Sequence, residues 1–156
     1  MHYFCQVITD LEAKLGPVLF QLPPAFKKDA AVLAAFLNDV PPGMRAAFEF
    51  RHASWFDEEV FALLNSKNIA LCIAESADLT TPVVATADYG YLRLRREDYT
   101  DADLERWAKA IGDNEKVWPD AFVYLKHEES GIGPKLAKQL MGILGGTGGT
   151  AEESGL

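Results

Sequence analysis

The amino-acid sequence predicts an α/β fold, in which parallel strands alternate with helices. Short apolar runs of strand length alternate along the chain with longer segments whose apolar residues recur at helical spacing. The connections between these segments are short, and such alternation is typical of parallel strands joined by right-handed crossovers. The chain has 156 residues, of which 49% are hydrophobic, so it can form the core of one globular domain.

The first half of the chain contains a helix followed by three expected strands. The helix is expected over residues 3–15, before a Gly16–Pro17 stop, and its apolar face comprises Phe4, Val7, Ile8, Leu11 and Leu15. The strands are expected over Val18–Leu22, Ala46–Arg51 and Ile69–Ala74. Between them, helices are expected over Lys28–Leu37 and, after the N-cap Asp57, through Val60, Phe61 and Leu64.

The second half adds two more strands. A longer loop over residues 77–88 precedes a strand over Tyr89–Arg95, and the last strand is expected over Ala121–Lys126. Thr100 and Asp103 form a capping-box pattern that opens a helix to Ile111, and Pro134 opens the last helix, which runs to Leu144. We therefore expect one domain over residues 1–144 and a disordered, glycine-rich tail over 145–156.

The order is thus a helix followed by five strand–helix units, which fits either a doubly wound sheet or a barrel. No Gly-x-Gly-x-x-Gly or phosphate-loop motif follows the first strand, which weakens the nucleotide-binding doubly wound folds. Polar residues on the inward faces of several strands favour a TIM-type barrel. Five units are too few to close a standard eight-stranded barrel, so the sequence predicts a partial one.

Composition restricts the partners and the compartment. The net charge of -8 argues against broad binding to nucleic acid or to an anionic membrane. Cys5 and Cys72 lie in apolar surroundings, as buried free thiols of a reducing compartment do. No apolar run is long enough to span a bilayer and no signal-like segment opens the chain, so the predicted location is cytoplasmic.

Four segments of the chain resemble the YecE-like family, the domain of unknown function numbered 72. They are residues 15–26 (LGPVLFQLPPAF), 47–56 (AFEFRHASWF), 86–94 (TADYGYLRL) and 123–127 (VYLKH). The resemblance implies a TIM-type barrel of which this chain matches the later part, so that its five strands are the fourth to eighth. The family's opening, with its glycine-rich first strand, aromatic–tryptophan segment, second-strand glutamate and third-strand lysine, is absent. No reaction is established for that family.

Two charged residues of the second strand are the leading candidates for a site. Glu49 and Arg51 alternate with Phe48 and Phe50, so both project to the side that faces the interior of a barrel. An arginine keeps a neighbouring carboxylate ionised and offers a two-pronged donor to an anionic substrate. A structural ion pair that fills the barrel is the alternative interpretation.

Other polar residues follow the ends of the expected strands. Gln21 could orient a substrate amide or hydroxyl group, or simply line the barrel. His52 follows directly after Arg51 and could act in general acid–base catalysis, for which histidine is the usual residue, although a structural role fits it as well. Glu75 would add a second carboxylate beside Glu49, as acid–base hydrolysis or a divalent metal requires. Trp55 could wall the pocket or belong to the core.

Positive charge gathers near the ends of the last two strands. Arg93 and Arg95 share a face of the fourth strand, and Tyr124 and Lys126 share a face of the fifth. We predict that Arg93, Tyr124 and Lys126 contact a ligand. The helix that starts near Pro134 offers free backbone amides, and barrel enzymes often bind phosphate after the seventh and eighth strands. An ordinary glycine-rich connection is the alternative there.

The sequence therefore predicts an enzyme-like pocket for a small anionic or phosphorylated ligand, with hydrolase- or lyase-like chemistry. The histidines His2, His52 and His127 lack the spacing of metal ligands, so no metal and no cofactor are predicted. The alternative is a non-catalytic fragment or binding module that needs the missing N-terminal strands or a partner chain. Unpaired edges at the first and last strands then favour self-association.

Overall fold

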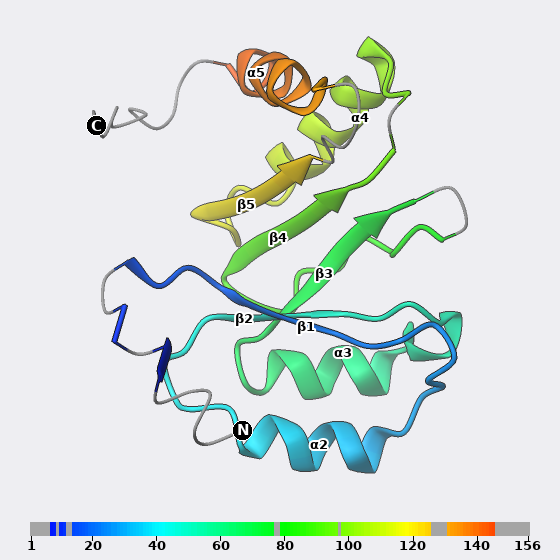
Figure 1. Ribbon diagram of the computed structural model, residues 1–156, viewed down its shortest axis with the longest axis vertical. Helices are drawn as coiled ribbons and strands as arrows, with labels where there is room; N and C mark the ends of the chain where they lie inside the picture. Colours follow the sequence, from blue (N-terminus) through cyan, green and yellow to red (C-terminus); the bar gives the residue numbers. More distant parts are fainter. Residues whose placement is uncertain are drawn as a thin grey trace.

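The structure, a computed structural model, describes residues 7–8, 10–11, 14–76, 79–96, 98–125 and 131–145. Within them, five parallel strands form one sheet in the order β1-β2-β3-β4-β5 (Figure 1). The strands are β1 (Val18–Gln21), β2 (Ala46–Glu49), β3 (Ala70–Glu75), β4 (Tyr89–Leu94) and β5 (Asp120–Leu125). The helices are α2 (Ala30–Asn38), the short 3-10 helix η2 (Ala53–Trp55), α3 (Glu58–Asn65), α4 (Asp101–Gly112) and α5 (Gly133–Ile143). None of the helices described is long and apolar enough to cross a membrane.

Alternation along β2 separates the two faces of the sheet. Phe48 packs in a core cluster with Leu33 of α2 and Leu64 of α3. Ala47 belongs to a different cluster, and Glu49 shares its face because residues two apart on a strand point to the same side. We call the face of Phe48 the helix face and the face of Glu49 the inner face. The predicted separation of Phe48 from Glu49 is confirmed.

The helices α2, α3, α4 and α5 all pack against the helix face. In β3, Leu71 joins the cluster that α2 and α3 form, and Ile73 joins the cluster that α4 and α5 form. Because Leu71 and Ile73 are two residues apart, both clusters lie on one side of the sheet. Figure 1 shows α2 and α3 beside the β1–β2 end of the sheet and α4 and α5 beside the β4–β5 end. None of the helices α2 to α5 packs on the inner face.

Capping side chains set where the helices begin. The carboxylates of Asp29 and Asp57 each accept a first-turn backbone N–H at 3.0 Å, which starts α2 and α3. Thr100 and Asp103 form the reciprocal capping box of α4, and Pro134 lies in the first turn of α5. The caps predicted at Asp57 and Thr100 and the first-turn position predicted for Pro134 are thus confirmed.

Small and aromatic side chains fill the inner face toward the N-terminal ends of the strands. This buried cluster comprises Ala47, Ala70, Cys72, Ala87, Tyr89 and Tyr91. The Tyr89 hydroxyl donates to the carbonyl oxygen of Ala46 at 2.8 Å and accepts from its N–H at the same distance, so it ties β4 to β2. The polar side chains of the inner face therefore lie toward its C-terminal edge.

The predicted α/β class and the parallel alternation are confirmed, and each strand agrees with its expected bounds to within two residues. The count of five strand–helix units is wrong, because the described residues between β3 and β4 form an irregular loop without a helix. The loop itself was expected, over residues 77–88. Lys126, the residues from 146 onward and most of the helix expected over 3–15 lie outside the described residues.

Candidate functional site

The centre of the candidate site is Glu49, the last residue of β2, whose exposed fraction is only 1%. Gln21 of β1 is its partner in the strand register and donates Nε2 to Glu49 Oε1 at 2.9 Å. On the other side, Arg93 of β4 donates Nη1 to Glu49 Oε2. Arg95 Nη1 lies 3.9 Å from Oε1. A buried carboxylate is tolerated only with such partners, so these contacts keep Glu49 in place.

Arg93 reaches Glu49 across an intervening strand because β3 has small side chains at this level. Ala74 is the register partner of Arg93, and Cys72 lies beside Glu49 with its Sγ 3.9 Å from Oε2. Strands in a sheet are about 4.8 Å apart, so an arginine can span two spacings when the side chains between them are short. The small residues of β3 therefore allow the ion pair between β2 and β4.

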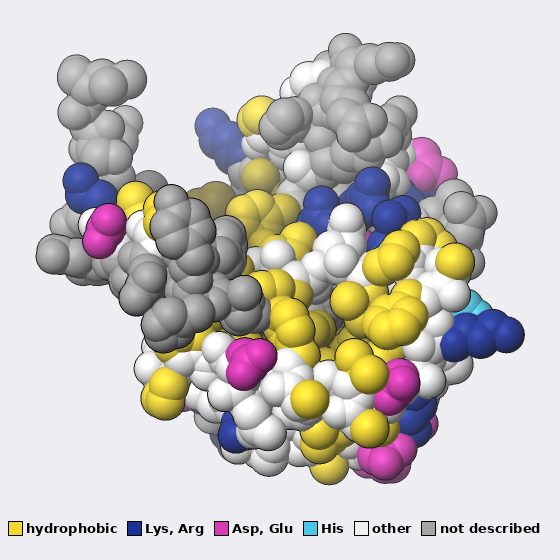
Figure 2. Space-filling model, turned by 60° about the horizontal axis from the view of Figure 1, so that its bottom comes forward, with side chains coloured by type: hydrophobic (Ala, Val, Ile, Leu, Met, Phe, Trp, Pro, Cys, Tyr) yellow, Lys and Arg dark blue, Asp and Glu magenta, His cyan; other side chains and the backbone are white. Residues whose placement is uncertain are grey.

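The cluster carries more positive than negative charge. Arg93 and Arg95 contribute two positive charges and Glu49 one negative charge, which leaves a surplus of one (2 − 1 = 1). The side chains of both arginines remain partly exposed, at 27% and 32%. In the space-filling view, Lys and Arg side chains gather near the middle of the visible face beside hydrophobic ones (Figure 2). The surplus contrasts with the net charge of -8 for the whole chain.

Burial and neighbouring charges shift the pKa of two side chains in this cluster. Burial lowers the pKa of Arg93, but its hydrogen bond to Glu49 and the charge of that carboxylate together raise it above the ordinary value. Burial raises the pKa of the Cys72 thiol, and the charge of Glu49 raises it further. Since the thiolate is the nucleophilic form of cysteine, Cys72 is not suited to nucleophilic catalysis.

Two tyrosines continue the inner face beside the arginines. Tyr91 of β4 and Tyr124 of β5 have ring centroids 5.1 Å apart, with an angle of 37° between the ring planes. Tyr124 is the register partner of Arg93, so the two side chains leave the sheet on the same face. The structure thus brings four of the predicted residues to one face, namely Gln21, Glu49, Arg93 and Tyr124.

Three predicted residues that follow β2 form no hydrogen bond or ion pair with Glu49, Arg93 or Arg95 among the described residues. Arg51 is exposed and has no ion pair among the residues described. His52 Nδ1 accepts the backbone N–H of Ser54 at 3.1 Å and lies 2.9 Å from its hydroxyl oxygen. Trp55 is buried in the helix-face core, where its ring stacks on Phe50 with centroids 4.6 Å apart. The structure therefore assigns Trp55 to the core, which was the alternative interpretation of this residue.

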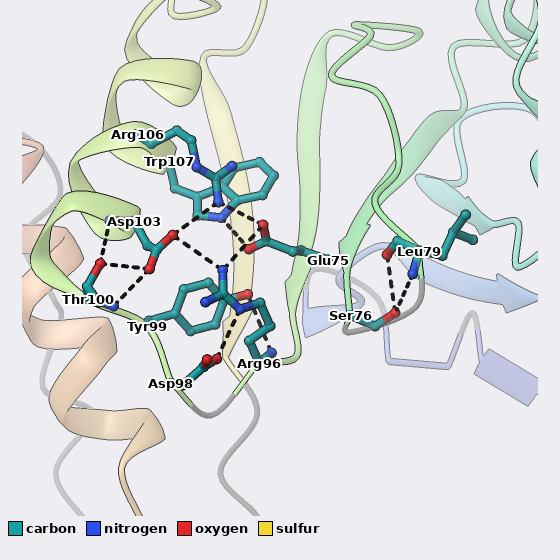
Figure 3. A network of polar contacts seen from close by, with 10 residues as sticks. All are labelled: Glu75, Ser76, Leu79, Arg96, Asp98, Tyr99, Thr100, Asp103, Arg106 and Trp107. Carbon is teal, nitrogen blue, oxygen red and sulfur yellow. Dashed lines mark hydrogen bonds and ion pairs between the residues drawn. The ribbon is translucent and has the colours of Figure 1, made fainter.

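The expectation that Glu75 adds a second carboxylate beside Glu49 is wrong, because Glu75 points to the helix face. Its Oε2 accepts the indole N–H of Trp107 at 2.9 Å, and its Oε1 accepts from Arg106 at 2.7 Å (Figure 3). Both partners belong to α4. Glu75 shares its side of β3 with Ile73, which packs against α4, so the strand geometry accounts for this orientation.

Arg96 is also part of this helix-face network. Arg96 Nε donates to Asp98 at 3.0 Å, and Nη1 donates to Asp103 at 3.3 Å (Figure 3). Its guanidinium lies 5.2 Å from the ring centroid of Tyr99. These contacts fix the connection between β4 and α4 immediately after Arg93 and Arg95.

Two further expectations concern the segment after β5. Lys126 lies outside the described residues, so the structure does not place it. α5 begins at Gly133 with no side-chain cap hydrogen bond, and Leu136 anchors it in the core. Among the described residues, no three His, Cys, Asp or Glu side chains gather closely enough to hold a metal ion.

Arg95 and Cys72 contact Glu49 but are not among the site residues that the sequence predicts. Arg95 shares its face of β4 with Arg93, and that alternation was a signal that could have identified it. Cys72 is part of a continuously apolar strand, so its pattern gave no indication of the face on which it lies.

Comparison with known proteins identifies relatives of this fold. One protein family, described as "Protein of unknown function DUF72", matches residues 1–154, which extends past the domain limit expected near residue 144. A solved DUF72 family protein from Thermotoga maritima has a TM-score of 0.77 and 23% identity, over 92% of this chain and 64% of that one. The comparison with curated proteins found no match.

A second solved DUF72 family protein, from Enterococcus faecalis, has a TM-score of 0.80 and 15% identity, again over 92% of this chain and 64% of that one. Identities at this level show the shared fold and nothing of the activity. The chain spans about two thirds of the length of the solved proteins it matches, at 64% in both cases.

Proposed function

The chain belongs to the DUF72 family, and on that premise we propose that its inner face binds a small anionic or phosphorylated ligand in an enzyme-like pocket. The observation that carries the proposal is the surplus positive charge around Glu49. The carboxylate neutralises one of its two neighbouring arginines, and both guanidinium groups keep exposed surface. Arginine presents its donors in a planar fork that matches the oxygens of a phosphate or carboxylate group.

We further propose that this face is the interior of a TIM-type barrel. The helices that pack on the sheet cover one face, as in a barrel, whereas a doubly wound fold has helices on both. The polar cluster lies at the C-terminal ends of the strands, which is the functional end of barrel enzymes. The longer solved relatives have room for the additional strands that closure requires.

The chemistry that we propose for this pocket is hydrolase- or lyase-like. Arg93 and Arg95 would hold the anionic group of the ligand, and Glu49 would keep both guanidinium groups oriented. His52 is the proposed proton donor and acceptor. Because its Nδ1 accepts the N–H of Ser54, the neutral ring carries its proton on Nε2, which is the atom available for transfer.

Calorimetric titration with inorganic phosphate at fixed ionic strength tests the anion site. Arg93→Ala and Arg95→Ala should each weaken binding by about 1–3 kcal/mol, the scale of a hydrogen bond to a charged group. Arg96→Ala is the matched control, since Arg96 pairs with Asp98 and Asp103 on the helix face and should leave affinity unchanged. Equal effects of the three substitutions, or no phosphate binding by the unmodified protein, would refute the proposal.

The sheet edges favour a second candidate, a binding module that needs further strands from a partner chain. β1 and β5 each pair with only one strand in the described sheet, and unpaired edges readily accept another strand. We propose that the isolated chain self-associates through these edges. Light scattering over a range of concentrations should show a mass that rises with concentration. A monomer that unfolds cooperatively at high temperature would contradict this candidate.

The proposed location is the cytoplasm. Cys72 is a free, buried cysteine, which suits a reducing compartment.

A further inference from the structure

An exposed aromatic ring lies directly beside the proposed anion site. Tyr124 of β5 has an exposed fraction of 48%, whereas its neighbour Tyr91 has one of only 6%. The two rings are packed with their centroids 5.1 Å apart. One side of Tyr124 is therefore supported by a buried ring, and much of the remaining ring surface is open to a ligand.

The strand register places this ring next to the arginines. Tyr124 pairs with Arg93 across β4 and β5, so both side chains leave the inner face at the same level of the sheet. The guanidinium of Arg93 is in turn held by Glu49. A fixed positive charge and an open aromatic surface thus lie side by side.

The residue type at this position also calls for an explanation. Natural proteins protect sheet edges with charged residues, prolines or bulges, because exposed apolar edges promote aggregation. β5 is an edge strand of the described sheet, and it exposes a large aromatic residue on the inner face. Stacking of the Tyr124 ring on a ligand would account for an aromatic residue at this position, since aromatic rings pair favourably at centroid separations of about 4.5–7 Å.

We propose that Tyr124 is a stacking platform for a ligand that joins a planar aromatic or heteroaromatic ring to an anionic group. The ring lies on Tyr124 and the anionic group lies at Arg93 and Arg95. This inference rests on the proposed anion site and adds the class of ligand that the site accepts.

Three probes separate the two parts of the ligand, namely inorganic phosphate, ethyl phosphate and phenyl phosphate. Ethyl and phenyl phosphate carry the same anionic group and differ in the ring. In calorimetric titrations of the full chain, phenyl phosphate should bind about 3- to 10-fold more tightly than ethyl phosphate, the range of an aromatic pair.

Two substitutions then localise the preference for the ring. Tyr124→Leu should abolish the difference between the two esters while leaving the affinity for inorganic phosphate unchanged, which also shows that the variant is folded. Tyr124→Phe keeps the ring and should retain the difference.

Phe26→Leu is the matched control for a rival ring site. Phe26 is 38% exposed and lines an apolar hollow of about 350 Å³ beside β1 and α2. The control should leave the difference between the esters unchanged. Loss of the difference in Phe26→Leu, or its persistence in Tyr124→Leu, would place the ring elsewhere and overturn the inference.

The remaining outcomes distinguish the inference from the proposed function. Equal binding of all three probes would leave the anion site intact and reject the platform. No binding of any probe would reject both. Binding of phenyl phosphate alone, without inorganic phosphate, would reject the anion site and the joint ligand that depends on it.

Discussion

Glu49 and Glu75 end neighbouring parallel strands, yet their carboxylates lie on opposite faces of the sheet. The register pairs Phe48 with Leu71, so the position beside Glu49 on β3 is Cys72. Glu75 lies three residues beyond Cys72, and an odd separation along a strand reverses the face. The two carboxylates therefore act in different environments: Glu49 faces two arginines on the inner face, and Glu75 faces α4.

This separation predicts different effects on anion binding. Glu49→Gln removes the negative charge that offsets Arg93 and Arg95 and that repels an anion, so phosphate affinity should increase by about 1 kcal/mol, the magnitude of the interaction between unit charges about 4 Å apart in water. Glu75→Gln should leave the affinity unchanged, because its partners are on the helix face. Calorimetry on both variants measures the difference. A similar change in phosphate affinity in both would contradict this arrangement.

Glu75 should instead contribute to folding stability. Glu75→Ala leaves the indole N–H of Trp107, a residue that is 1% exposed, without its acceptor. A buried donor without a partner costs about 1–3 kcal/mol, so the free energy of unfolding in urea should fall by that amount. Glu59→Ala is the control, since the Glu59 side chain is 63% exposed and pairs only at the surface with Lys28. An equal loss in the two variants would argue against a structural role for Glu75.

Gly90 of β4 should tolerate no side chain. A Cβ atom at this position would lie 2.9 Å from Cε3 of the buried Trp118 ring, closer than van der Waals contact. Gly90→Ala should therefore lower the free energy of unfolding by about 1–3 kcal/mol, as overpacking of a core does. Gly112, near the end of α4, has no atom within 4 Å of such a Cβ, so Gly112→Ala should cause no loss. Thermal unfolding of both variants makes the comparison. Equal stability of the two would show that the Trp118 ring shifts to accommodate the added methyl group.

Local patterns in the sequence predicted most of the fold because each one depends on neighbouring residues. Asp57 and Thr100 cap helices through contacts with residues three positions away, so their motifs are visible along the chain. Alternation along β2 likewise placed Phe48 and Glu49 on opposite faces. A single strand with mixed polarity is enough for such a prediction.

The site was less predictable because it depends on how strands align with one another. β3 is apolar along most of its length, so no alternation shows which face Glu75 takes, and the interstrand register decides it. The contact of Arg93 with Glu49 depends on the small Ala74 between them. Neither relation is a property of one segment, and both required the assembled sheet.

The capping box of α4 predicts how stability depends on pH. Hydrogen bonds from the backbone N–H of Thr100 and from its hydroxyl, assisted by Arg96, lower the pKa of Asp103 from 3.8 to about 2. A carboxyl whose pKa is lower in the folded state stabilises that state fully above its unfolded pKa. The contribution is lost as pH falls from about 4 through the folded pKa of about 2.

Urea unfolding of the unmodified chain and of Asp103→Asn between pH 7 and pH 2 measures this contribution. The difference in free energy of unfolding should be constant above about pH 5 and should shrink as the pH approaches 2. Thr100→Ala removes the hydroxyl donor and leaves the backbone N–H, so the pKa of Asp103 should rise part of the way back. The loss should then still begin near pH 4, which the unfolded state sets, but should be complete at a higher pH. A difference between the unmodified chain and Asp103→Asn that stays constant down to pH 2 would show that the ionised Asp103 carboxylate does not stabilise the start of α4.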